Sequence, residues 1–172
     1  MADDTPEAVR LASTISHAMS GTPWHGTALR PLLADVRAAD AARTVMPGTH
    51  SIWAIVLHLT AWCREVTRRV RTGEAQDPVD GDWPPVPAVP TPEAWTAACE
   101  ALQAAHDELA ALLASSPDAV MRRRVGDVRD AALGTGLSVR ATVLGVAQHA
   151  AYHGGQIALL KKVLHASAPT PP

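Results

Sequence analysis

Four segments of the chain carry apolar side chains at spacings of three and four residues, the rhythm of a helix with one buried face. They cover residues 5–19, 51–73, 91–114 and 138–164. Residue types that cap helix N-termini stand at the starts of the last three segments, at Ser51, Thr91 and Ser138. Because each helix must bury its apolar face against the others, the pattern predicts an all-α four-helix bundle.

The connections between these segments refine that prediction. Residues 74–92 contain six prolines, so we expect an extended connection between the second and third helices. A connection of this length can run the full length of a bundle, which allows the two helices it joins to be parallel. Residues 118–137 are polar and rich in glycine, and no segment predicts a strand. Thr27 is a candidate cap for a short additional helix.

The length fits one domain covering residues 1–172, with a disordered tail from about residue 166. The formal net charge is −2 and the basic residues form no extended face, which argues against a nucleic-acid partner. The acidic N-terminus does not resemble a signal peptide, and no run reaches the ~20 apolar residues that span a bilayer. We therefore expect a cytoplasmic protein with no membrane partner and with Cys63 and Cys99 reduced.

Histidine is the residue type that carries candidate chemistry here. His149 and His153 are four residues apart, so they share one helix face at about 6 Å from each other, a spacing that suits two ligands of one metal ion. His58 flanks the apolar face of the second helix and can lie opposite them in a bundle. From the residues alone, a metal site and a set of hydrogen-bonded core histidines are equally good interpretations.

Two sequence signatures add to this interpretation. Residues 145–157 (GVAQHAAYHGGQI) resemble the last-helix pattern GxxxHxxYHxGQI of the DinB-like, or YfiT-like, family. Residues 47–53 (PGTHSIW), followed by His58 and Trp62, resemble that family's PGxHSIxxxxxHxxxW pattern, and Trp24-His25-Gly26 resembles a WHG stretch of one branch. Gly154 departs from the pattern, in which alanine is commoner.

The resemblance implies a four-helix bundle with a long crossover between helices two and three. It also implies that His58, His149 and His153 bind one divalent metal ion. Some members of the family transfer or add low-molecular-weight thiols to electrophiles. Imidazole ligands do not decide the metal, and zinc or nickel is our expectation.

Three further residues are candidates for a catalytic or substrate-positioning role: Gln156, His25 and His106. Gln156 shares the face of the histidine pair and can orient an imidazole, although a helix-packing hydrogen bond is an equal alternative. His106 lies on the apolar face of the third helix, where a hydrogen-bonded core histidine is the favoured interpretation. His25 lies at a helix break beside glycine.

The pattern also predicts the surroundings of four more side chains. Trp62 is expected in the core rather than beside the metal, and Glu65 is expected to be exposed near a helix end. Tyr152 can bond a neighbouring helix through its hydroxyl. Trp53 lies off the inward face of its helix, which suggests either a homodimer contact or a cover for the proline-rich connection. The remaining histidines are expected at the surface or as caps: His17, His50 and His165.

Three functions fit these observations. The first is a metal-dependent transferase or hydrolase that acts on a small molecule, such as a low-molecular-weight thiol. The second is a metal-binding stress-response or interaction module without turnover. The third is a helical interaction domain without metal.

Overall fold

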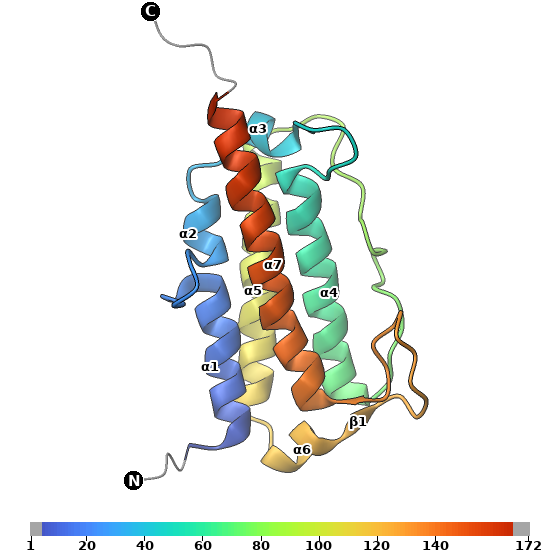
Figure 1. The fold of residues 1–172 in the computed structure, drawn as a ribbon. Coiled ribbons are helices and arrows are strands. Elements are labelled where there is room, and N and C mark those ends of the chain that lie inside the picture. The colour runs from blue at the N-terminus through green and yellow to red at the C-terminus, as the bar shows by residue number, and fades with distance from the viewer. Residues whose placement is uncertain (1–4, 167–172) are drawn as a thin grey trace, which may run out of the picture.

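The structure, a computed structural model, describes residues 5–166, and its body consists of four long helices packed side by side (Figure 1). They are α1 (Glu7–Ser20), α4 (Ile52–Thr72), α5 (Pro92–Ala114) and α7 (Val139–Ala166). Helices α1 and α4 each contact both α5 and α7. The predicted all-α four-helix bundle is therefore confirmed.

The helix boundaries follow from local capping chemistry. The hydroxyl oxygens of Ser51, Thr91 and Ser138 each accept a hydrogen bond from a backbone N–H three residues later, as expected at helix N-termini. Gly73 ends α4 in the left-handed conformation, with φ 80°. The suggested cap at Thr27 is wrong, because α2 (Leu29–Leu33) begins after Ala28 and has no side-chain cap. An uncapped start leaves its first N–H groups without a side-chain partner.

The proline-rich connection allows α4 and α5 to be parallel. Both run in the same direction in Figure 1, while α1 and α7 run in the opposite direction. Residues 74–91 pass alongside the bundle from the end of α4 to the start of α5. This segment lies against α4 near the middle of the bundle, where it contributes to the site described below.

Small elements close the two ends of the bundle: α3 (Ala38–Ala42), α6 (Asp118–Arg122), β1 (Arg124–Val125) and β2 (Leu137–Ser138). The two strands pair antiparallel, with Val125 opposite Leu137. This pairing corrects the expectation that the chain has no strand. A two-residue ladder is too short to produce the alternating pattern that identifies strands in a sequence. The loop between the strands, residues 126–136, lies beside α4 and α7 (Figure 1).

The apolar core consists of two clusters stacked along the bundle. On α4 the first cluster ends at Leu59 and the second begins at Cys63. On α7 they meet between Val146 and Ala150. The histidines at positions 58, 106 and 149 lie at this junction, so a polar layer crosses the middle of an otherwise apolar interior.

Trp53 corrects one sequence expectation. Its side chain is 1% exposed and its ring lies 5.2 Å from that of Trp95, at an interplanar angle of 59°. It is therefore a core residue, because α3 and α5 cover the side of α4 that was expected to be free. It supports neither a homodimer contact nor a cover for the proline-rich connection.

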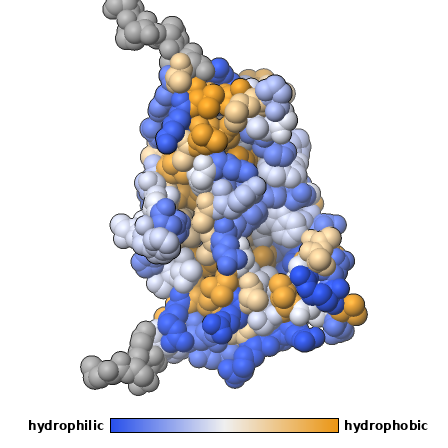
Figure 2. Space-filling model, in the orientation of Figure 1, coloured by the Kyte–Doolittle hydropathy of each residue, from blue (hydrophilic) through white to orange (hydrophobic). Residues whose placement is uncertain are grey.

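The surface is mostly hydrophilic on the face shown in Figure 2, with hydrophobic side chains gathered toward the C-terminal end of α7. Tyr152 and Leu159 are exposed on that helix. Among the helices of residues 5–166, none combines the length and the apolar character needed to cross a bilayer. Helix α7 extends to Ala166, and the rest of the expected disordered tail lies outside the described residues.

Candidate metal centre

Helix α4 and the crossover together fix the orientation of His58. The imidazole lies two turns into α4 and is 6% exposed. Its Nδ1 lies 2.6 Å from the carbonyl oxygen of Asp82 and 3.2 Å from that residue's Oδ1. Because a carbonyl oxygen only accepts, Nδ1 is the donor, which leaves Nε2 as the acceptor atom of the neutral ring.

Helix α7 presents His149 and His153 one turn apart. His153 is 5% exposed, and its Nδ1 lies 2.7 Å from Oε1 of Gln156. This hydrogen bond leaves Nε2 of His153 as the acceptor atom. The half-buried His149 places its Nε2 2.9 Å from Nε2 of His58. Gln156 thus orients one imidazole, as the sequence allowed.

The three imidazoles converge on one point. One ring nitrogen from each lies within 4.8 Å of the other two, and the ring centroids are 4.5–5.0 Å apart. Two imidazole nitrogens bound to the same ion at about 2.0–2.1 Å are roughly 3–3.5 Å apart. The cluster therefore fits one divalent ion with small adjustments. Protein groups hold the outer nitrogens of His58 and His153, which is the usual arrangement around metal-binding histidines.

The protonation states also suit a metal ligand. Burial, together with the neighbouring His153 and His58, lowers the pKa of His149 to about 4. Burial likewise lowers the pKa of His153, against the opposing effect of its hydrogen bond to Gln156. Both imidazoles are therefore neutral at pH 7, and neutral imidazole is the form that binds metals.

An aromatic stack covers one side of this cluster. The Trp83 ring, from the crossover, stacks on His58 at 3.9 Å between centroids and on His50 at 3.4 Å. His50 is exposed, as expected, yet it belongs to this stack. Trp83 and Asp82 were not among the residues predicted to form the site. Their signal was an acidic and an aromatic residue side by side in a segment otherwise dominated by proline.

Trp62 lies at the site and is only partly buried. Its Nε1 donates a hydrogen bond of 2.6 Å to Oδ1 of Asp82, so Trp62 and His58 together hold the Asp82 carboxylate. The expectation of a core tryptophan is wrong, and the alternative in which Trp62 forms a wall of the site agrees with the structure. The groove beside α4 remains open here, which periodicity alone does not reveal.

Glu65 was expected to be exposed, and it is 3% exposed. Its carboxylate accepts hydrogen bonds from the side chains of Arg68 and Arg69 and from the backbone N–H of Gln76. Burial alone would raise its pKa, but these donors together lower it. The carboxylate is therefore ionised and fully occupied by structural partners. The crossover folds back over the end of α4 and buries it.

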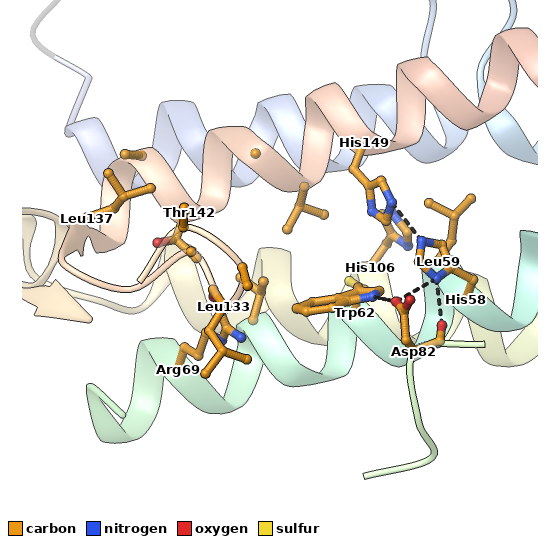
Figure 3. A pocket seen from close by; sticks show the side chains of 18 residues that line it. His58, Leu59, Trp62, Arg69, Asp82, His106, Leu133, Leu137, Thr142 and His149 are labelled. Carbon is orange, nitrogen blue, oxygen red and sulfur yellow. Dashed lines mark hydrogen bonds and ion pairs between the residues drawn. The ribbon is translucent and has the colours of Figure 1, made fainter. Parts of the chain in front are cut away.

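A pocket of about 420 Å³ extends from the histidine cluster along the groove between α4 and α7 (Figure 3). His58 and His149 lie at one end, and Arg69 and Leu133 lie toward the other. His106, from α5, lines the pocket and is 1% exposed. Cys63 also lines it, but burial raises the pKa of its thiol to about 12, so it is not a reactive thiolate.

The remaining candidates lie away from the cluster. His25 is exposed in the α1–α2 connection, where it contacts Trp24 and lines a separate cavity with Leu32 and Gly154. The structure thus does not bring His25 to the three histidines. Tyr152 is 65% exposed and lies edge-on to His153. His17 and His165 are exposed, as expected.

Comparison with known proteins yields one family. The sequence model of the DinB superfamily matches residues 24–157, which include all three histidines and most of the bundle. No curated protein and no solved structure matches the chain at a significant level. Because the matched segment covers well over half of the sequence and the fold is the expected bundle, the chain belongs to the DinB superfamily.

Proposed function

We propose that this protein is a metal-dependent enzyme that transfers a low-molecular-weight thiol to an electrophile, or hydrolyses a small substrate, at His58, His149 and His153. The observation that carries the proposal is the convergence of three imidazoles at one end of a pocket. Three protein ligands leave coordination positions of a divalent ion open for substrate or water. When bound there, such an ion lowers the pKa of a thiol or water and so supplies a nucleophile near neutral pH.

The residues of the chain do the positioning. Asp82 and Gln156 hold the outer nitrogens of His58 and His153, and Trp83 covers the cluster on one side. The pocket provides a partly enclosed space beside the cluster for the electrophile. In the transfer reaction the thiol sulfur forms a bond to carbon, the leaving group departs with its electron pair, and the thiol proton passes to solvent.

Zinc and nickel are the metals that we propose, since both accept imidazole ligands. Cys63 and Cys99 are free thiols, which agrees with the proposed cytoplasmic location. A homodimer also stays a proposal. Since Trp53 is buried, the exposed Tyr152 and Leu159 of α7 are better places than Trp53 to look for such a contact.

The test is a turnover assay on metal-loaded and chelator-stripped protein. We would follow the conjugation of a small thiol to a chromogenic aryl halide, and in parallel the hydrolysis of a chromogenic ester. The proposal expects activity that requires metal and is lost in His153→Ala, with His165→Ala, an exposed histidine of the same helix, as the matched control. Bound metal without either activity would instead support a metal-binding stress-response or interaction module.

A further inference from the structure

The pocket beside the histidine cluster has mainly apolar walls. Leu59, Cys63 and Val66 line it from α4 and Val146 lines it from α7, while Leu133 and its neighbours in the 126–136 loop close its far end (Figure 3). Walls of this kind favour burial of an apolar group over a hydrated one. The body of a bound molecule is therefore expected to be apolar.

The charges around the pocket do not favour an anion. Arg69 is the one cationic side chain among the described residues that line it, and it is 3% exposed. Its guanidinium donates to Glu65 and to the carbonyl oxygens of Leu133 and Gln76. Arg69 is therefore neutralised and fully engaged, while Asp82 contributes a negative charge near the cluster. Away from the histidine cluster, the walls of the pocket therefore offer a carboxylate or phosphate no available cation.

The imidazole of His106 can accept a hydrogen bond from a molecule in the pocket. Its Nδ1 lies 2.9 Å from the carbonyl oxygen of Leu102, one turn earlier in α5, so Nδ1 carries the proton. Its Nε2 is a buried acceptor with no hydrogen-bond partner among the described protein atoms. Burial lowers the pKa of this imidazole, which keeps the ring neutral and Nε2 available as an acceptor. Leaving a buried acceptor unpaired is unfavourable, so a ligand that donates to it gains affinity.

We propose that the pocket binds an uncharged substrate with a slender apolar body and one hydroxyl or N–H group, and that this group donates a hydrogen bond to Nε2 of His106. His106 lines the same pocket as His58 and His149, so the bound molecule lies beside the cluster (Figure 3). His106 is thus a positioning and specificity-determining residue. That the bound molecule reacts rests on the proposed function, whereas its binding to the pocket does not.

Three probes of similar shape test the proposal on the full chain: 1-hexanol, its methyl ether and hexanoate. Affinity is measured by titration, and the ring nitrogens of His106 are followed by long-range proton–nitrogen NMR. We expect the alcohol to bind about three- to tenfold more tightly than the ether, the value of one net hydrogen bond. In the metal-free protein, we also expect hexanoate to bind most weakly. The alcohol, but not the ether, should shift the resonance of Nε2.

Two variants isolate Nε2. His106→Asn keeps a donor near Leu102 but removes the acceptor, whereas His106→Gln keeps an amide group near the position of Nε2. The preference for the alcohol should disappear in the first variant and persist in the second. Far-UV circular dichroism checks that both variants fold, and the resonance shift in the unmodified protein provides a test without any variant.

Several results would overturn the proposal: equal affinity for alcohol and ether, preferred binding of hexanoate by the metal-free protein, no binding of any probe, or an unshifted Nε2. Equal affinity for alcohol and ether, or an unshifted Nε2, would mean that water donates the hydrogen bond to His106 instead. Each titration is run on metal-free and metal-loaded protein, with the metal content measured separately. Failure of the metal site is therefore distinguished from failure of the His106 contact.

Discussion

His58 of the histidine cluster and Glu65 of the buried ion pair lie on the same face of α4, two turns apart. The two side chains differ in how far their polar atoms are occupied by hydrogen-bond partners. At Glu65 the carboxylate oxygens receive donors from two arginines and a backbone N–H. At His58 the outer nitrogen is held, while Nε2 meets another imidazole nitrogen at 2.9 Å. The saturated carboxylate holds the fold together, whereas the converging imidazole nitrogens are placed to bind a ligand.

Trp62 separates these two regions. Its indole donates to Asp82 beside the cluster, and its ring lies 5.5 Å from the guanidinium carbon of Arg69 at the ion pair. We therefore expect substitutions in the two regions to have different consequences. Changes at the ion pair should affect the stability of the fold, and changes around the histidines should affect metal affinity.

The largest effect is expected from Glu65→Ala. The substitution leaves the buried Arg69 without its carboxylate, which should lower the free energy of unfolding by about 3–5 kcal/mol in urea denaturation. The control is Glu108→Ala, which breaks an exposed ion pair with Arg71 and should cost less than about 1 kcal/mol. Equal stability of the two variants would contradict the claim that the buried ion pair stabilises the fold.

Gln156→Ala should act on the metal site with little effect on the fold. Without its amide oxygen, the Nδ1 proton of His153 loses its partner, and metal affinity should fall about 10- to 100-fold. Competition with a chromophoric chelator measures the change. Gln148→Ala, at an exposed position on the same helix, should leave affinity unchanged. If both variants bind alike, the Gln156 contact serves only helix packing.

The stability of the metal-free protein should fall as the pH is lowered from about 6.5 to about 4. In the unfolded chain His149 takes up a proton near its ordinary pKa of 6.5, whereas in the fold it does so only near 4. The unfolded state thus binds more protons in this window and is favoured by acid. Unfolding followed across this range should show a shallower slope in His149→Gln, and an unchanged slope would contradict the assignment.

The smallest effect is expected from Trp62→Phe, which removes the hydrogen bond to Asp82 and keeps an aromatic wall. Because Asp82 is also held by His58, metal affinity should fall only about two- to tenfold. Trp24→Phe, at a side chain that is 96% exposed, provides the control in the same chelator assay. A loss as large as that in Gln156→Ala would make Trp62 a principal determinant of the site.

The sequence predicted the bundle because helix caps and apolar periodicity are local properties. Ser51, Gly73 and Thr91 act as expected, and the proline-rich connection left α4 and α5 free to be parallel. The structure also brings together the three histidines that the DinB-like patterns singled out. Periodicity does not predict which hydrogen-bond partner each polar side chain finds.

Contacts between distant segments explain the errors. Glu65 is buried because the crossover returns over it, and Trp53 is buried because α5 supplies Trp95. Asp82 and Trp83 belong to a segment with no periodic structure, so no pattern pointed to them. A helical pattern identifies one buried face, but it does not show what packs against the rest of the helix.

The central claim is that His58, His149 and His153 hold one metal ion, and counting metal per chain tests it most directly. Protein purified without a metal-binding tag is analysed by elemental analysis beside His149→Ala, His153→Ala and the control His165→Ala. We expect about one ion per chain in the unmodified protein and the control, and loss of the ion in the other two variants while they stay helical. No bound metal in the unmodified protein, even after incubation with zinc or nickel salts, would contradict it.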